Sequence, residues 1–369
     1  MQTCRAYAKQ GNEVVLVTLQ VRRPDGEKIN RIWDHYGIEP DFAVRVFPSP
    51  LRRDPSLWWF RLWAGVAAFT CAARVAATQI LRPRETIVHA RIPMSIGPFL
   101  LLNLCLPASR RVRVVLENHS IPRLEHARIL RKVDLIVTNS EKLASDICLQ
   151  LGVARDRVLH SPLGPHSRIR DLPKSEARAE LGLRSDFALA CYAGKLTREQ
   201  SDFLLHTAAK AADALPNFRL LVVGGNPEII EWTNRRAAEL GVSDVIVLAG
   251  FVAPARVEKH LAAADVLAYY LPESTQTFLY CTPAKGYDYQ AAGRPIVAVD
   301  IPLFEEVFGK DGDRAIRVRQ RTPEAFADAI VKALALGDGA GAMTERAKAW
   351  VAQRTWERRT EAILRRLAV

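Results

Sequence analysis

The chain has 369 residues, of which 49% are hydrophobic and 25% charged, a composition that excludes disordered and fibrous classes and leaves room for two domains. Its six cysteines show no C-x-x-C pair or metal-ligand spacing, which indicates a reduced, cytoplasmic protein. The net charge of +12 favours an anionic partner, but no zinc-finger spacing, RNP-type aromatic strand or long basic run indicates nucleic acid.

Short apolar runs in the first half predict buried strands. We expect strands at 13–19, 42–47, 86–92, 111–117 and 135–140. Because these runs are continuous and not alternating, the strands are expected to be buried on both faces, which is typical of parallel sheets. The sequence therefore predicts an α/β domain.

A strongly apolar segment at 57–81 allows two interpretations. Its uninterrupted apolar core runs only from Leu62 to Ala73, between two arginines, so we expect a helix packed on the sheet and not a membrane span. The nearby tryptophans and arginines also fit a patch that binds the anionic inner face of a membrane. The alternative is a solvated basic face. The residues concerned are Arg52, Arg53, Trp58, Trp59, Arg61, Trp63, Arg110, Arg111, Arg113, Arg131 and Lys132.

The segment LENHSIP (116–122) directly follows a predicted strand. Glu117 and His119 are therefore expected at the carboxyl end of a parallel strand, where α/β proteins bind ligands. A lone histidine is more often structural than catalytic. His119 becomes a candidate catalytic residue because of its position at the end of the strand.

The second half repeats the strand–helix pattern. Strands are expected at 188–194, 219–225, 244–250, 265–271 and 295–300, and 171–186 has the character of a linker with a surface helix. We expect a first domain at 1–170, a second at 171–345 and a closing helix at 346–369 that crosses back. Two doubly wound, Rossmann-like domains of this kind would face a cleft.

Two segments of the second half carry charges at strand or helix ends. Gly194 and Lys195 follow a strand and precede a helix, an arrangement that suits phosphate. In 272–300, Thr282 and Pro283 are expected as N-cap and first residue of a helix that ends at Gly293. Lys285 would face phosphate there, while Asp288, on nearly the same side, would meet a sugar hydroxyl. An ordinary capped helix is the alternative.

Taken together, the second half resembles the donor domain of retaining GT-B glycosyltransferases of family 4 (glycosyl transferases group 1). The matching residues are YAGKLTREQ, LLVVGG, IVLAGFVAPARVEKHLAAADVLAYYLP and TPAKGYDYQAAGRPIVAVD, within 187–335. In the first half, HARIP (89–93), which contains Arg91, LENHS, DLIVTNSEKLASDI and HSPLG fall where the family has acceptor-side landmarks.

The resemblance implies a role for individual residues. Gly194 and Lys195 would hold the donor diphosphate, Asp288 the ribose, and the main chain of Val252 the base. His119 would lie near the transferred sugar, with Glu117 and Arg91 on the acceptor side. The leaving diphosphate would be stabilised by cations and helix ends, so no metal or other cofactor is expected.

The sequence departs from the family pattern at three points. The second diphosphate cation is replaced by Gln200, with Arg198 as a substitute, and the first of two glutamates is Tyr280, which cannot carry the negative charge. The family pattern also places a strand and a Gly-rich loop before GNEVVLVT (11–18), so the first domain is expected to lack its first strand.

These observations favour hexosyl transfer from a nucleoside-diphosphate sugar to a glycan or lipid-linked saccharide, with retention. The expected protein is cytoplasmic and peripheral on the inner face of the membrane. A non-catalytic sugar-nucleotide binder that partners another transferase is the main alternative, favoured by Gln200 and Tyr280. A nucleotide-sugar epimerase is a third hypothesis, disfavoured by the sequence AAGRP after Asp288.

Overall fold

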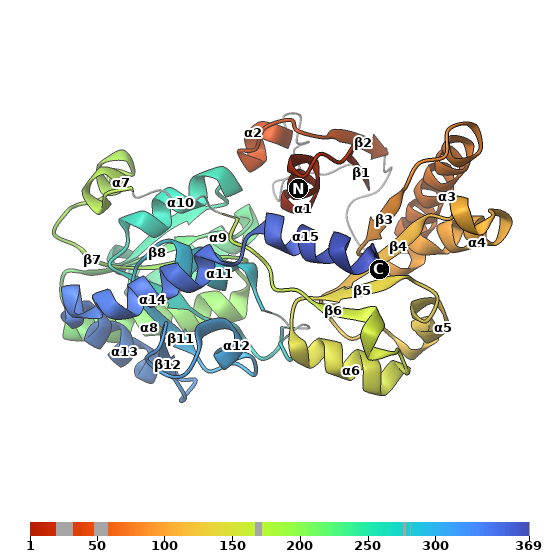
Figure 1. Ribbon diagram of the computed structural model, residues 1–369. Coiled ribbons are helices and arrows are strands. Elements are labelled where there is room, and N and C mark those ends of the chain that lie inside the picture. Colours follow the sequence, from red (N-terminus) through yellow and green to blue (C-terminus); the bar gives the residue numbers. More distant parts are fainter. Residues whose placement is uncertain (20–31, 48–57, 167–171, 276–277, 281, 369) are drawn as a thin grey trace. The chain divides into compact units, whose positions relative to one another are not determined.

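The computed structural model describes residues 1–19, 32–47, 58–166, 172–275, 278–280 and 282–368 (Figure 1). The chain forms two compact units. Unit 1 comprises Met1–Val21, Asp41–Pro162 and Trp356–Val369, and unit 2 comprises Arg22–Pro40 and Leu163–Thr355. In both units parallel strands alternate with helices, which is the predicted α/β architecture.

The described part of unit 1 contains two parallel sheets. In the first, β1 (Val15–Leu19) pairs with β2 (Ala43–Phe47). The second has the order β3-β4-β5-β6 and consists of β3 (Ile87–Ala90), β4 (Arg113–Asn118), β5 (Leu135–Thr138) and β6 (Val158–His160). Val114, Val115 and Leu116 of β4 are fully buried, as the continuous apolar run predicts for a central strand.

Helices connect and cover these strands. They are α1 (Gln2–Lys9), α3 (Trp58–Leu81), α4 (Gly97–Cys105), α5 (Ala127–Leu130), α6 (Glu141–Leu151) and α15 (Trp356–Leu367). α6 shows how the sequence sets such boundaries: the Ser140 hydroxyl accepts a hydrogen bond from the Leu143 N–H, and the helix ends at Gly152 with φ +61°. α15 packs on α1 and on the main sheet through Ile363 and Leu367.

Helix α3 is longer than the apolar core seen in the sequence. By length and composition alone, its stretch Trp63–Leu81 is sufficient to cross a membrane, and 22% of its most apolar part is buried. Arg74 is exposed on this helix and does not interrupt it, and the bounds of α3 agree with the segment 57–81 that was expected to be helical. α3 packs against α4, yet leaves Val66, Phe69 and Ile80 exposed. Arg52 and Arg53, and the side chains of Trp58, Trp59 and Arg61, lie outside the described residues.

Unit 2 is built on a six-stranded parallel sheet. Its order is β12-β11-β10-β7-β8-β9. The strands are β7 (Ala188–Ala193), β8 (Phe218–Val223), β9 (Ile246–Gly250), β10 (Val266–Tyr269), β11 (Ile296–Val299) and β12 (Ile316–Val318). From β7 the chain adds β8 and β9 on one side of the sheet, and it then adds β10, β11 and β12 on the other side. This is the Rossmann strand order, in which all strands are parallel. The side of the sheet on which successive strands are added changes between two adjacent strands, here β7 and β10.

Some helices of unit 2 pack on this sheet, and others pack on those helices. The helices of unit 2 are α2 (Ile32–Tyr36), α7 (Lys174–Glu180), α8 (Arg198–Ala214), α9 (Pro227–Glu239), α10 (Pro254–Ala263), α11 (Ala284–Ala291), α12 (Phe304–Phe308), α13 (Pro323–Leu336) and α14 (Gly341–Ala352). Thr197 is the N-cap of α8, and its side chain accepts a hydrogen bond from Gln200 N. Asn226 is the N-cap of α9, and its side chain accepts a hydrogen bond from Ile229 N.

Two segments belong to a different unit from the one expected from the sequence. α2 packs on α10, where a Cβ at Gly37 would come within 2.6 Å of the Ala255 Cβ, so this part of the predicted first domain belongs to unit 2. The predicted closing helix at 346–369 is two helices. α14 packs on α11 in unit 2, and only α15 belongs to unit 1.

Candidate functional site

The strand order of unit 2 marks one place on its sheet edge. β7 and β10 are neighbours, and the chain continues from them in opposite directions, so the loops after these two strands separate and leave room for a ligand at their carboxyl ends. Gly194 and Lys195 follow β7, and Tyr270 follows β10. This switch point is where the sequence placed the diphosphate.

Lys285 of α11 brings a positive charge to the switch point. Its Nζ donates a 2.6 Å hydrogen bond to the Tyr270 carbonyl and lies 4.6 Å and 4.7 Å from the ring centroids of Tyr192 and Tyr269. Its Cδ would be 3.4 Å from a Cβ at Gly194. The ammonium group is therefore held by aromatic faces and a carbonyl beside the turn after β7.

Two buried tyrosines fix that turn. The Tyr192 hydroxyl donates to the Lys195 carbonyl (2.7 Å) and accepts from Gln200 Nε2 (3.0 Å). The Tyr289 hydroxyl accepts from Ala193 N at 2.7 Å. Burial raises the pKa of both phenols, so they remain neutral. Gln200, which replaces the family's second cation, is thus a buried support for the turn.

Glycine is required at the end of the neighbouring strand. Gly224 follows β8 with φ +131°, and a Cβ at this position would lie 1.9 Å from the Gly194 carbonyl oxygen. Gly194 N in turn donates to the Val223 carbonyl at 2.9 Å. The backbones after β7 and β8 therefore approach each other more closely than any side chain allows.

The predicted cations of this turn have different surroundings. Lys195 is exposed, and within the described part of the chain its side chain makes no hydrogen bond or ion pair. Arg198 is also exposed and pairs with Glu228 of α9, Nη2 to Oε1 3.2 Å. Lys195 is therefore the cation available to a ligand after β7.

The start of α11 corrects one prediction. Pro283, and not Thr282, is the N-cap, with extended dihedral angles (φ −63°, ψ 133°) and no side-chain cap hydrogen bond. Helical geometry consequently begins at Ala284, and Thr282 is fully buried one residue before the cap. At the other end, Gly293 has φ +63°, as predicted.

Asp288 lies one turn after Lys285 on α11. Its Oδ1 accepts a 2.6 Å hydrogen bond from the His166 backbone N–H, and its Oδ2 is 3.6 Å from His166 Nδ1. Tyr280 and Val252 are half-buried, Tyr280 in the turn before α11 and Val252 after β9, where it packs on the core. The ligand contacts expected for these three residues stay predictions.

A second candidate cluster lies in unit 1, at the carboxyl ends of β3 and β4. Glu117 Oε1 is 2.6 Å from His119 Nε2 and 2.8 Å from Arg91 Nη2, and Oε2 is 3.2 Å from His89 Nε2. The Glu117 side chain is 1% exposed, whereas those of His119 and Arg91 are 30% and 58% exposed. The predicted acceptor-side residues thus meet at one carboxylate.

Glu117 is an anion in the folded protein. Burial alone would raise its pKa, but the hydrogen bonds from His119 and His89 and the charges of Arg359 and Arg91 lower it well below the usual range. Arg359 reaches it from α15, Nη2 to Oε2 3.3 Å, and also donates to the Pro162 carbonyl at 3.2 Å.

Sequence reasoning missed His89, Arg359, Tyr192, Tyr289 and His166. His89 had a detectable signal, because it lies two residues before Arg91 at the end of the same predicted strand. The two tyrosines resembled core aromatic residues. Arg359 and His166 have partners far away in the chain, which no local pattern indicates.

Two family models match most of the chain. The model for glycosyl transferases group 1 matches residues 188–335, and the model for Glycosyltransferase Family 4 matches residues 1–164. The first covers the switch point of unit 2, and the second covers the Glu117 cluster.

Curated relatives are similar at low identity. The D-inositol 3-phosphate glycosyltransferase of Nocardia farcinica is 28% identical over 249 residues, 64% of this chain and 53% of the relative. The chain thus matches about half the length of that protein. A GDP-mannose-dependent alpha-(1-6)-phosphatidylinositol monomannoside mannosyltransferase of Mycobacterium tuberculosis is 26% identical over 331 residues, 80% of this chain and 84% of the relative.

Solved structures share the fold at still lower identity. Anabaena HepE in complex with UDP has a TM-score of 0.65 at 16% identity and covers 96% of this chain and 99% of its own. Sucrose-phosphate synthase from Thermosynechococcus elongatus has a TM-score of 0.69 at 18% identity, with 99% and 90% covered.

Proposed function

Since the chain belongs to the group 1, family 4-like glycosyltransferases and has their GT-B fold, we propose that it transfers a hexosyl group from a nucleoside-diphosphate sugar to a glycan or lipid-linked saccharide. We further propose that the anomeric configuration is retained and that no metal takes part. The relatives and structural neighbours are named for different donors, acceptors or bound ligands. The proposal therefore specifies neither the sugar nor the base of the donor.

One observation carries the proposal: Lys285 is held at the carboxyl ends of β7 and β10, beside Gly194 and next in space to the turn that carries Lys195. An ammonium group fixed in this way stabilises negative charge that develops on a leaving diphosphate without reorganising. The N-terminal end of α11 adds a favourable helix dipole.

Transfer would then proceed by departure of the nucleoside diphosphate. The bond between the anomeric carbon and the diphosphate oxygen breaks, the electron pair goes to the diphosphate, and Lys195 and Lys285 offset the new charge. The resulting oxocarbenium-like sugar is attacked by the acceptor hydroxyl on the same face, which gives retention. The proton of that hydroxyl leaves with the diphosphate.

We assign the Glu117 cluster of unit 1 to the acceptor side. The Glu117 carboxylate, 2.6 Å from His119 Nε2, accepts a hydrogen bond from an N–H at that position, and in the neutral ring this leaves the lone pair on Nδ1. Glu117 thereby fixes the tautomer and the orientation of a partly exposed imidazole. Arg91 is a second exposed donor in the same cluster.

A non-catalytic sugar-nucleotide binder is the second candidate. Gln200 is buried against Tyr192, and Tyr280 replaces an acidic residue of the family, so two charges of the usual donor site are absent from these positions. Incubation with a panel of nucleoside-diphosphate sugars and saccharide acceptors separates the two, because an enzyme releases nucleoside diphosphate and a binder releases none.

We also propose peripheral association with an anionic inner membrane face. Support comes from helices α3 and α4, which expose Val66, Phe69, Ile80, Leu101 and Leu104, and from exposed arginines on and after α3. Apolar side chains enter the headgroup region, and basic residues near it contribute about 1 kcal/mol each. These arginines are Arg74, Arg82 and Arg84.

A further inference from the structure

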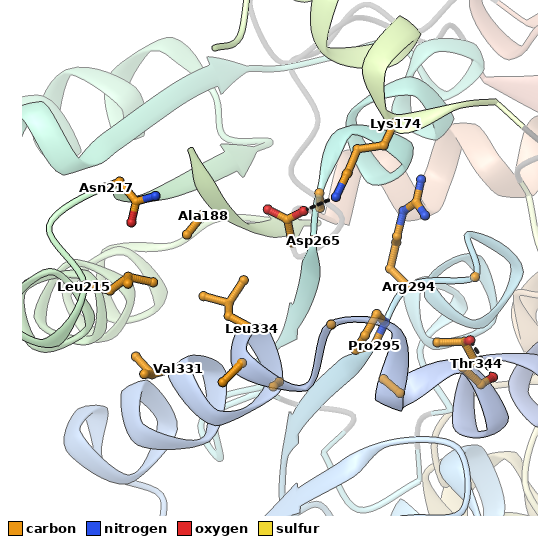
Figure 2. A pocket seen from close by; sticks show the side chains of 17 residues that line it. Lys174, Ala188, Leu215, Asn217, Asp265, Arg294, Pro295, Val331, Leu334 and Thr344 are labelled. Atoms are coloured by element: carbon orange, nitrogen blue, oxygen red, sulfur yellow. Dashed lines mark hydrogen bonds and ion pairs between the residues drawn. The ribbon is translucent and has the colours of Figure 1, made fainter. Parts of the chain in front are cut away.

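Unit 2 contains a cavity at the edge of its sheet opposite the candidate donor site (Figure 2). The cavity has a volume of about 740 Å³ and is lined by residues at the amino ends of three strands: Ala188 begins β7, Asp265 precedes β10 and Pro295 precedes β11. Lys195 and Lys285 belong to the carboxyl ends of the same strands. A ligand in this cavity would therefore not occupy the donor site.

Much of the cavity wall is apolar. Val331 and Leu334 come from the last turns of α13, and Leu215 from the residue after α8. Two glycines leave the space unfilled: Gly337, directly after α13, and Gly341, the first residue of α14. Such a wall suits a hydrocarbon chain or another apolar body.

Arg294 places a poorly solvated cation in this cavity. Its Nε and Nη2 both donate to one acceptor, the Ala262 carbonyl, at 3.3 Å and 2.9 Å, and within the described residues it has no ion pair. Burial lowers its pKa, and the charge of Arg178 adds to the effect against the opposing charge of Asp265. The Ala262 carbonyl offsets only part of the solvation that a half-buried guanidinium loses, so a bound anion would stabilise Arg294 further.

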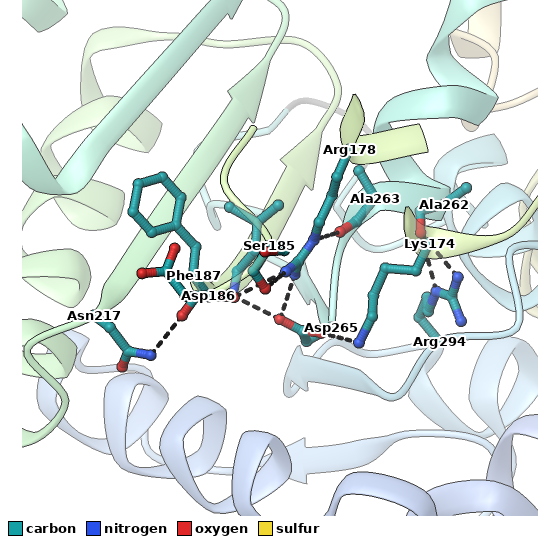
Figure 3. Close-up of polar contacts among 11 residues, drawn as sticks. Lys174, Arg178, Ser185, Asp186, Phe187, Asn217, Ala262, Ala263, Asp265 and Arg294 are labelled. Atoms are coloured by element: carbon teal, nitrogen blue, oxygen red, sulfur yellow. Dashed lines mark hydrogen bonds and ion pairs between the residues drawn. The ribbon is translucent and has the colours of Figure 1, made fainter. Parts of the chain in front are cut away.

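Both carboxylate oxygens of Asp265 accept hydrogen bonds from donors other than Arg294 (Figure 3). Its Oδ1 accepts from Lys174 Nζ at 2.6 Å, and its Oδ2 accepts from Arg178 Nη2 at 2.6 Å and from Leu189 N at 2.8 Å. These contacts hold its pKa below the usual value despite burial. Lys174, Arg178 and Arg294 together carry three positive charges, and the single negative charge of Asp265 does not neutralise them.

We propose that this cavity binds an amphiphilic anion. Its phosphate or carboxylate head pairs with Arg294 and with the partly exposed Lys174, and its hydrocarbon part lies against Leu215, Val331 and Leu334. A planar guanidinium suits either head group, because it binds two oxygens at once. Both parts are needed for binding, which distinguishes the site from a general phosphate site.

The test uses the whole chain and octyl phosphate below its micellar concentration, with saturating nucleoside diphosphate present. Isothermal titration is expected to show one octyl phosphate bound, with at least tenfold weaker binding of inorganic phosphate and of octanol. Arg294→Gln should weaken octyl phosphate at least tenfold, and Arg294→Lys less. Lys195→Ala, at the other edge of the sheet, should leave octyl phosphate binding unchanged.

Leu334→Glu serves as a second variant that keeps Arg294 and adds a carboxylate to the apolar wall. It should abolish octyl phosphate binding, while nucleoside diphosphate binding shows that unit 2 is folded. The proposal is overturned if octyl phosphate competes with nucleoside diphosphate, if inorganic phosphate binds as tightly, or if folded Arg294→Gln binds octyl phosphate like the unmodified protein.

Discussion

Arg359 and Glu117 form a buried ion pair, with Nη2 3.3 Å from Oε2 and both side chains 1% exposed. Arg359 lies just after the chain returns to unit 1, and it also donates to the carbonyl of Pro162, the last residue before the chain leaves that unit. The Arg359 side chain therefore contacts the residue at which the chain leaves unit 1 and also the Glu117 carboxylate that holds His119. Arg359 itself lies at the point where the chain returns to unit 1.

Replacing Arg359 should destabilise the protein strongly. Arg359→Gln leaves Glu117 without its buried countercharge, and removing one partner of such a pair costs about 3–5 kcal/mol. Urea denaturation measures the free energy of unfolding. Arg365→Gln is the control, because Arg365 forms an exposed pair with Glu361 on the same helix. Similar losses for both variants would show that the buried pair has no special importance.

The contribution of Glu117 to stability should depend on pH. Its folded-state pKa is lowered, so its contribution is complete above the unfolded-state pKa of about 4.3 and is lost as pH falls through the folded pKa. The difference in unfolding free energy between unmodified protein and Glu117→Gln is expected to be constant above about pH 5.5 and to shrink below pH 4. Denaturation curves from pH 3 to 7 measure it, and a difference that stays constant throughout would contradict the assignment.

Lys195→Ala and Lys285→Ala should each weaken nucleoside-diphosphate binding while leaving bare nucleoside nearly unaffected. Loss of one charge-assisted contact to phosphate costs about 1.5–3 kcal/mol. Titration calorimetry compares the two ligands. Lys210→Ala, which removes an exposed lysine of α8 far along the helix from its start, should change neither affinity. Equal losses for nucleoside and diphosphate would show that the lysines do not contact phosphate.

Binding to anionic vesicles should be sensitive to salt and to the exposed apolar residues of α3 and α4. Phe69→Ser combined with Leu104→Ser is expected to reduce flotation, and high salt to reduce it further. Leu149→Ser is the matched control, since Leu149 is 81% exposed on α6. Flotation that persists at high salt and requires detergent for release would instead indicate an inserted helix.

A chelator should not reduce donor binding, because the proposal assigns the diphosphate to lysines. The aspartates of the sequence DGD (311–313) already have basic partners: Asp311 pairs with Arg319, and Asp313 with Arg314 and Arg346. Donor titrations with and without EDTA test this. Loss of binding with EDTA and recovery with manganese would refute metal independence.

The buried strands of the two larger sheets could be predicted from sequence because each is a continuous apolar run. The expectation of burial on both faces was wrong for β1 and β2, which expose Val15, Val17 and Val46. β6 and β12 were missed, since with three residues each they are too short to give a pattern. Gly194, Lys285, Glu117 and His119 were found because strand and helix ends can be located locally.

Contacts between distant parts of the chain could not be predicted. Arg359 reaches Glu117 and α2 packs on α10 only in the folded protein, and a buried tyrosine that supports a turn has the same local pattern as one that fills a core. The hydrogen bonds of the Tyr192 and Tyr289 hydroxyls therefore become apparent only in the folded protein.

The most direct test of the central claim is release of nucleoside diphosphate from a panel of nucleotide sugars in the presence of saccharide acceptors. Acceptor-dependent release from at least one donor is expected in the presence of EDTA, and NMR should show a product of retained configuration. Lys285→Ala should lower this rate by about one to two orders of magnitude, the kinetic equivalent of 1.5–3 kcal/mol. Tight binding of a donor without turnover, with any acceptor, would contradict the claim and leave a sugar-nucleotide binder.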